Sequence, residues 1–146
     1  MTRYHTRIRT PWSVAESFAY MADLRNFARW DPSVRKVTQT TGQGGGSASV
    51  FDVTIAGVPK DITLTYRTAE YDAPHQLLVV ARSRFFTSED HIAVTPDGEG
   101  SVVEYDAQLR LNGVLGFADF ALRPYFDRIA ERAATGLRAA LDGTEV

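Results

Sequence analysis

The hydrophobic pattern of the chain changes its period once, near residue 112, and this change limits the folds that the chain can adopt. Between residues 34 and 111 apolar and polar residues alternate, which is typical of strands with one buried face. From residue 114 to 141 apolar residues recur about every 3.6 positions, which indicates a long helix with one apolar face. Strands followed by one long helix predict an α+β fold in which the helix covers an antiparallel sheet.

Short turn segments divide the alternating region into successive strands. They lie at residues 42–46, 57–59, 72–74, near 85, and at 96–100, and most of them contain glycine or proline. The glycines at 42–46 precede a strand pattern rather than a helix, so they predict a turn and not a phosphate-binding loop. With a further strand at residues 4–9, the sequence predicts about seven strands in an antiparallel meander.

Two short helices are predicted directly after the first strand. Thr10 with Pro11 is one candidate start for the first helix, and a capping box beginning at Ser13 is the other. Asp23 can cap a second helical turn, and the Asp31-Pro32 pair should end it.

The C-terminal helix is predicted to bury one face against the sheet. Pro124 lacks an amide hydrogen, so a break or kink is expected near Leu122. Residues 114–122 are apolar on almost every side. They are interpreted as the buried start of the helix, as a cavity lid hinged by Gly113, Gly116 and Pro124, or as a contact with a partner or membrane. The predicted buried face of the helix comprises Leu122, Phe126, Ile129, Ala133, Leu137 and Leu141.

Pairing the strands through loops of even length places the apolar residues on one face of the sheet. This register pairs Val53 with Ile62 and Val79 with Ile92, and it pairs Arg82 with Glu89 and His91 with Asp106 on the polar face. The predicted inner face comprises Phe51, Val53, Ile55, Ile62, Leu64, Tyr66, Leu77, Val79, Ala81, Ile92, Val94, Val103, Tyr105, Ala107 and Leu109.

Composition excludes several classes of function. The chain has 146 residues, a net charge of −2 and no cysteine, so neither nucleic-acid binding nor thiol chemistry is indicated. His5, His75 and His91 do not converge in the predicted fold, so we expect no metal site, and no cofactor is indicated. No apolar run is long enough to cross a bilayer and no signal peptide is evident, which favours a cytoplasmic protein.

Three segments carry a family resemblance: residues 8–18 (IRTPWSVAESF), 21–32 (MADLRNFARWDP) and 96–105 (PDGEGSVVEY). They resemble the START-like (SRPBCC) superfamily, and within it the branch named for polyketide cyclases, dehydrases and lipid transport. The resemblance implies one domain over residues 1–146 with a helix-grip fold, in which a curved sheet wraps around the C-terminal helix and encloses a cavity. Members of the superfamily bind lipids, sterols, polyketides or hormones, and some are enzymes.

Asp90 is the sharpest anomaly in the predicted sheet. The register points it inward between Ala81 and Ala107, where a carboxylate is costly unless it is paired and where small neighbours leave space. Asp90 is interpreted either as a polar group in an apolar pocket or as a residue near a strand end that reaches water. Tyr105 is the second candidate for acid/base chemistry. The predicted ligand-binding residues are Phe51, Tyr66, Ala81, Asp90, Tyr105, Ala107, Phe117 and Phe120.

Three functions remain open on sequence alone. The first is binding or carriage of a small hydrophobic molecule between the sheet and the C-terminal helix. The second is a polyketide cyclase- or dehydratase-like enzyme that uses Asp90 and Tyr105. The third is a protein-interaction module whose apolar helix start docks a partner. Trp12 and Trp30 are expected to be core anchors, and the oligomeric state is not predicted.

Overall fold

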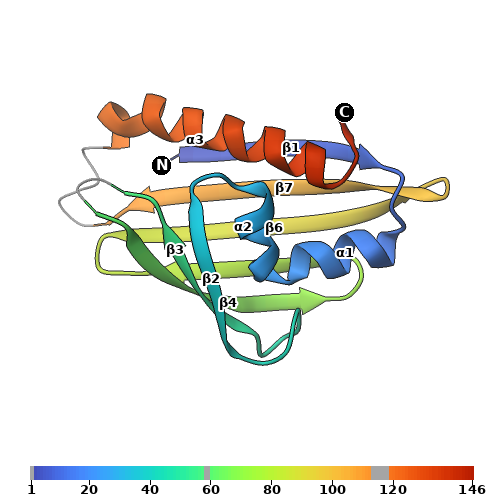
Figure 1. The fold of residues 1–146 in the computed structure, drawn as a ribbon, viewed down its shortest axis with the longest axis horizontal. Coiled ribbons are helices and arrows are strands. Elements are labelled where there is room, and N and C mark those ends of the chain that lie inside the picture. The colour runs from blue at the N-terminus through green and yellow to red at the C-terminus, as the bar shows by residue number, and fades with distance from the viewer. Residues whose placement is uncertain (1, 58–59, 113–118) are drawn as a thin grey trace.

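The fold is a curved antiparallel sheet with all of its helices on one face (Figure 1). It is described from a computed structural model that covers residues 2–57, 60–112 and 119–146, without the side chains of residues 2 and 119–123. The strands in these ranges are β1 (Thr2–Thr10), β2 (Val34–Thr41), β3 (Val50–Ile55), β4 (Ile62–Asp72), β5 (Gln76–Arg82), β6 (Phe86–Asp97), β7 (Gly100–Leu111) and β8 (Thr144–Glu145).

The sheet order is β2-β3-β4-β5-β6-β7-β1-β8, and every neighbouring pair is antiparallel. The predicted meander is therefore confirmed, with the two-residue strand β8 added to the expected seven. The helices are α1 (Val14–Ala22), the 3₁₀ turn η1 (Leu24–Asn26), α2 (Phe27–Trp30) and α3 (Asp119–Ala140). The α+β helix-grip fold inferred from the sequence is the fold that the structure shows.

The inner face of the sheet is the predicted one, although two of the hairpins are shifted by two residues. Val53 lies opposite Leu64, and Val79 lies opposite Asp90 rather than Ile92. A shift of two residues keeps every side chain on its own face because strands have a period of two. The pairings of Tyr66 with Ala81 and of Ile92 with Tyr105 are as predicted.

The shift in the β5–β6 hairpin comes from Ser83. Its hydroxyl oxygen accepts hydrogen bonds from the backbone N–H groups of Phe85 and Phe86, at 3.2 and 3.0 Å, which centres the turn one residue earlier than expected. The predicted pair of Arg82 with Glu89 is therefore wrong, because Arg82 lies opposite Thr87.

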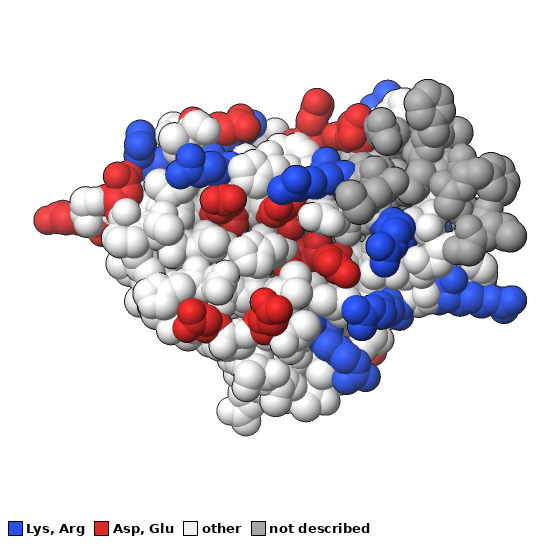
Figure 2. Space-filling model, turned by 180° about the vertical axis from the view of Figure 1, so that it is seen from behind, with Lys and Arg blue, Asp and Glu red and all other residues white. Residues whose placement is uncertain are grey.

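The outer face of the sheet carries charged side chains of both signs among uncharged ones (Figure 2). Arg3 donates to Asp106 at 2.6 Å and Arg9 to Asp97 at 2.7 Å, and His91 lies opposite Asp106 as predicted. Both arginines are exposed, so each of these ion pairs contributes little to stability. This face has the character of a solvated surface.

The first helix begins at Ser13 and not at Thr10. The Ser13 hydroxyl accepts from the N–H of Glu16 at 3.2 Å, and the Glu16 carboxylate accepts from the N–H of Ser13 at 3.3 Å. Thr10 ends β1, and its hydroxyl accepts from the N–H of Trp12 while donating to the carbonyl of Leu141. The strand ladder and these two contacts keep Thr10 out of the helix.

Helix α3 continues through Pro124, so the predicted break is absent. Pro124 lies in the second turn of the helix, where it removes one backbone hydrogen bond without ending the helix. Farther along, Gly136 lies against α2, and a Cβ atom there would collide with the carbonyl oxygen of Trp30. This close approach fixes α2, and with it Trp30, beside α3.

Candidate functional site

A cavity of about 570 Å³ lies between the inner face of the sheet, α2 and α3. The sheet contributes mostly aliphatic walls, including Val53, Ile62 and Leu109. Helix α3 contributes large side chains such as Phe126 and Ile129 and also three small ones, Ala130, Ala133 and Ala134. The small size of these alanines leaves space between α3 and the sheet that larger side chains would occupy.

Four of the eight predicted site residues line this cavity: Tyr66, Asp90, Tyr105 and Ala107. Phe51 and Ala81 do not, since they are only 0% and 1% exposed and pack in the core beside it. The two-residue shift in the β5–β6 hairpin explains the error for Ala81, which lies opposite Ser88 instead of Asp90. The two remaining residues, Phe117 and the side chain of Phe120, lie outside the described part of the chain.

Asp90 is buried in the cavity wall and is the centre of a hydrogen-bonded chain. Only 3% of it is exposed, so the interpretation in which it reaches water at a strand end is wrong. Tyr105 donates its hydroxyl to Oδ2 of Asp90 at 2.8 Å, and Ser88 donates to Oδ1 at 3.4 Å. Tyr66 in turn donates to the hydroxyl oxygen of Ser88 at 2.8 Å. In this series of hydrogen bonds both tyrosine hydroxyls act as donors.

Burial raises the pKa of Asp90 to about 7. The hydrogen bonds from Tyr105 and Ser88 favour the charged form and lower the pKa, while the negative charges of Asp31 and Asp106 raise it further. Burial and the charge of Asp90 raise the pKa values of Tyr66 and Tyr105, so both remain protonated donors. Asp90 is the group of this cavity that can take up and release a proton near neutral pH.

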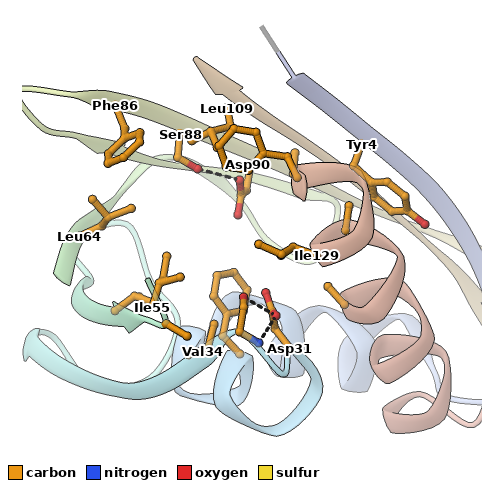
Figure 3. Close-up of a pocket in the computed structure, with 18 of the residues that line it drawn as sticks. Tyr4, Asp31, Val34, Ile55, Leu64, Phe86, Ser88, Asp90, Leu109 and Ile129 are labelled. Atoms are coloured by element: carbon orange, nitrogen blue, oxygen red, sulfur yellow. Dashed lines mark hydrogen bonds between the residues drawn. The ribbon is translucent and has the colours of Figure 1, made fainter. Parts of the chain in front are cut away.

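Asp31 is a second carboxyl group in the cavity, and the sequence analysis missed it. It follows α2, and its Oδ1 accepts from the N–H and the hydroxyl of Ser33, at 2.9 and 2.7 Å. Burial raises the pKa of Asp31 above its usual range. Figure 3 shows Asp31 and Asp90 pointing into the cavity from opposite walls. From the sequence, the Asp31-Pro32 pair predicts only the end of a helix. The structure confirms that end, because Asp31 caps the C-terminus of α2.

Aromatic rings surround this polar part of the cavity. Trp30 makes edge-to-face contacts with Phe27 and Tyr105, at ring-centre distances of 4.9 and 5.5 Å, and Phe27 makes another with Tyr66 at 6.3 Å. All four rings line the cavity. Trp30 is buried, as predicted, and is also part of the cavity wall. Trp12 is only half-buried and packs edge-on against Tyr20.

The histidines and acidic residues do not form a metal site in the described ranges. His5 contacts Glu104, His91 contacts Gln76, and His75 lies in the β4–β5 turn. Within the described residues, no group of three or more potential ligands could hold a metal ion.

The family model described as polyketide cyclase/dehydrase and lipid transport matches residues 1–142. The chain belongs to this family. The predicted resemblance to the START-like superfamily is thereby confirmed. No curated protein matches the chain significantly.

Solved structures share the fold at low sequence identity. The protein TTHA0849 of Thermus thermophilus is 14% identical with a TM-score of 0.75, over 96% of this chain and 97% of that one. A START superfamily protein of Mycobacterium smegmatis is 10% identical with a TM-score of 0.75, over 96% and 97% of the two chains. The Zhui aromatase/cyclase of Streptomyces sp. R1128 is 12% identical with a TM-score of 0.73, over 96% and 90%. At these identities the similarity establishes the fold alone.

The described helices contain no segment that is long and apolar enough to cross a membrane.

Proposed function

We propose that this family member binds a small, largely apolar molecule in the cavity between the sheet and α3. The observation that carries the proposal is the cavity itself, which is lined mainly by apolar side chains and contains two hydrogen-bonded carboxyl groups, Asp90 and Asp31. Its volume of about 570 Å³ lies within the range of roughly 300–1,000 Å³ typical of small-molecule sites.

Two kinds of side chain line the cavity, and they contribute to binding in different ways. The aliphatic and aromatic walls supply affinity through buried apolar area, at about 25 cal/mol per Å². Asp90, Tyr66 and Tyr105 supply orientation, because they place hydrogen-bonding atoms at a fixed position in a mainly apolar space. Without an occupant the walls would lack dispersion contacts on one side, which favours a ligand that fills the space.

Binding of the neutral fluorescent probe N-phenyl-1-naphthylamine tests the proposal. We expect the probe to brighten on addition of the protein and to be displaced by unlabelled apolar molecules. Ala107→Leu should weaken binding at least about tenfold, because leucine enters the cavity at a lining position. Ala139→Leu is the matched control, since Ala139 is an exposed residue of α3 outside the lining. Equal binding by the two variants, or no binding by the wild type, would contradict the proposal.

A second candidate function is an enzyme of the cyclase or dehydratase type. It is favoured by one observation, the Asp90 carboxyl group with a pKa of about 7 that is hydrogen-bonded to Tyr105 inside the cavity. Such a group can remove or supply a proton at neutral pH, and a general acid or base contributes about 10²–10⁴-fold to rate. The Zhui aromatase/cyclase supports this candidate by fold.

The enzyme candidate is tested by incubating the protein with polyketide-like β-hydroxy ketones and following loss of water by mass spectrometry. Wild type should form product, and Asp90→Asn should form little while still binding the fluorescent probe. If Asp90→Asn still forms product at the wild-type rate, Asp90 does not take part in the reaction. The cavity gives no support to the interaction-module alternative.

A further inference from the structure

The polar part of the cavity contains two carboxyl groups that face each other. Asp90 projects from β6 in the sheet, and Asp31 projects from the turn after α2 on the opposite wall (Figure 3). They are close enough for the charge of Asp31 to be among the causes that raise the pKa of Asp90. Oδ1 of Asp31 is held by Ser33, and one oxygen of Asp90 is held by Tyr105, so the protein fixes the directions of both groups.

The protein supplies no positive charge between these carboxyl groups. Among the described lining residues the only basic side chain is Lys60, which is exposed on the loop between β3 and β4. When both groups are ionised they repel each other, and the hydrogen bonds from Ser33, Ser88 and Tyr105 compensate only part of their lost hydration, since burial raises the pKa of both groups. A ligand that carries a positive charge would compensate both groups at once.

The aromatic rings around the carboxyl groups favour the same ligand chemistry. Phe27, Trp30, Tyr66 and Tyr105 line the cavity and contact one another in edge-to-face pairs. Ring faces attract cations, and aromatic cages recognise alkylated ammonium groups. Carboxylates alone would also suit a neutral hydroxyl donor, but carboxylates together with aromatic faces suit an ammonium group.

We infer that this cavity recognises an apolar molecule carrying a positively charged amine, protonated or quaternary, which lies between Asp31 and Asp90 and against the surrounding aromatic rings. The inference rests on the proposed function and names its class of ligand. The alkyl or ring portion of the ligand then lies along the aliphatic walls formed by β3, β4 and α3. A molecule with an anionic head group is disfavoured, since it would face two carboxylates.

Three probes with the same chain and different head groups test the inference: decyltrimethylammonium, decanol and decanoate. Binding is measured by titration calorimetry at pH 8, below the concentration at which any probe forms micelles. We expect decyltrimethylammonium to bind at least about tenfold more tightly than decanol, and decanoate to bind most weakly. The difference between the first two probes isolates the head group, because their chains are identical.

Asp31→Asn and Asp90→Asn test whether these two carboxyl groups cause the preference for the cation. In each variant the readout is the ratio of the affinity for decyltrimethylammonium to the affinity for decanol. Each substitution should reduce the preference for decyltrimethylammonium over decanol several-fold while decanol binding persists. Asp72→Asn is the matched control, since it removes an exposed carboxylate that is not part of the lining, and it should keep the wild-type ratio.

The failures of the two proposals are distinguishable. If all three probes bind equally, or decanoate binds best, the inference is wrong and the proposed function stands. If the preference is unchanged in both Asp31→Asn and Asp90→Asn, the inference is also wrong. If no probe binds to the wild type, the proposed function fails, and the inference fails with it.

Discussion

The two ends of the protein interior use the same face of the same sheet in different ways. At the end covered by α1, Phe18 and Met21 pack toward β6 and β7, and Leu77 and Ile92 are almost completely inaccessible. We call this the filled end. At the end covered by α2 and α3, which we call the open end, sheet residues such as Ile62 are half-buried and line the cavity. The long strands β6 and β7 run through both ends (Figure 1).

The difference arises from the helices rather than from the sheet. Helix α1 presents Phe18 and Met21 to the sheet, whereas α3 presents three alanines, Ala130, Ala133 and Ala134, beside the larger Phe126, Ile129 and Leu137 at the open end. The two carboxyl groups of the cavity follow the same division, because Asp31 and Asp90 both belong to the open end. The open end therefore differs from the filled end in two ways: the covering helix has three small residues among its larger ones, and the walls carry carboxyl groups.

The largest expected effect compares truncations at the two ends. Leu77→Ala should lower the free energy of unfolding by about 2–5 kcal/mol, because it leaves a void in a close-packed region. Ile62→Ala should cost clearly less, because its side chain already borders open space. Urea denaturation of both variants measures the difference. Equal losses would mean that the open end is as tightly packed as the filled end.

The next effect is a pH dependence of stability that arises from Asp90 in the open end. The pKa of Asp90 is about 7 in the folded protein and about 4 in an unfolded chain, so the folded state holds this proton more tightly. Its contribution to stability is fully present below about pH 4 and is lost as the pH rises to about 7. At about 1.4 kcal/mol per pKa unit, the total change is a few kcal/mol.

The measurement is the stability difference between wild type and Asp90→Asn at several pH values. Asp90→Asn should gain stability relative to wild type between pH 4 and pH 7. Asp106→Asn provides the opposite case, because hydrogen bonding to Arg3 lowers the pKa of Asp106 and its contribution is lost as the pH falls. A difference for Asp90→Asn that does not vary with pH would show that Asp90 is solvated.

A smaller effect distinguishes two alanines on the inner face. Ala81→Leu should destabilise the protein by about 1–3 kcal/mol, because Ala81 is enclosed by the core. Ala107→Leu should leave stability nearly unchanged or raise it slightly, because the added atoms enter the cavity. Thermal unfolding of the two variants makes the comparison. A large loss in Ala107→Leu would show that this position is already close-packed.

The sequence predicts the fold well because the fold depends on periodicity. Alternation assigned each strand residue to its face, and this assignment survived two-residue register shifts in the β3–β4 and β5–β6 hairpins. The same shifts made the neighbours of Asp90 wrong, because a neighbour depends on the exact turn. Ser83 sets the turn of the second hairpin through side-chain hydrogen bonds that periodicity does not detect.

The site is predicted only in part because it combines residues that are distant in sequence. Asp90, Tyr105, Tyr66 and Ala107 were found because they share the inner face of the sheet. Asp31 was not found, because its position opposite Asp90 depends on how α2 packs against α3. No local pattern around Asp31 reports that packing.

The most direct test of the account is an NMR titration of the protein with the neutral probe decanol. Methyl and aromatic resonances of the open end, such as those of Ile62, Ile129 and Tyr105, should shift progressively and saturate. Resonances of Leu77 and Ile92 in the filled end should remain in place. If both ends respond equally, or if only resonances of the outer sheet face shift, the cavity is not the ligand site and the account is contradicted.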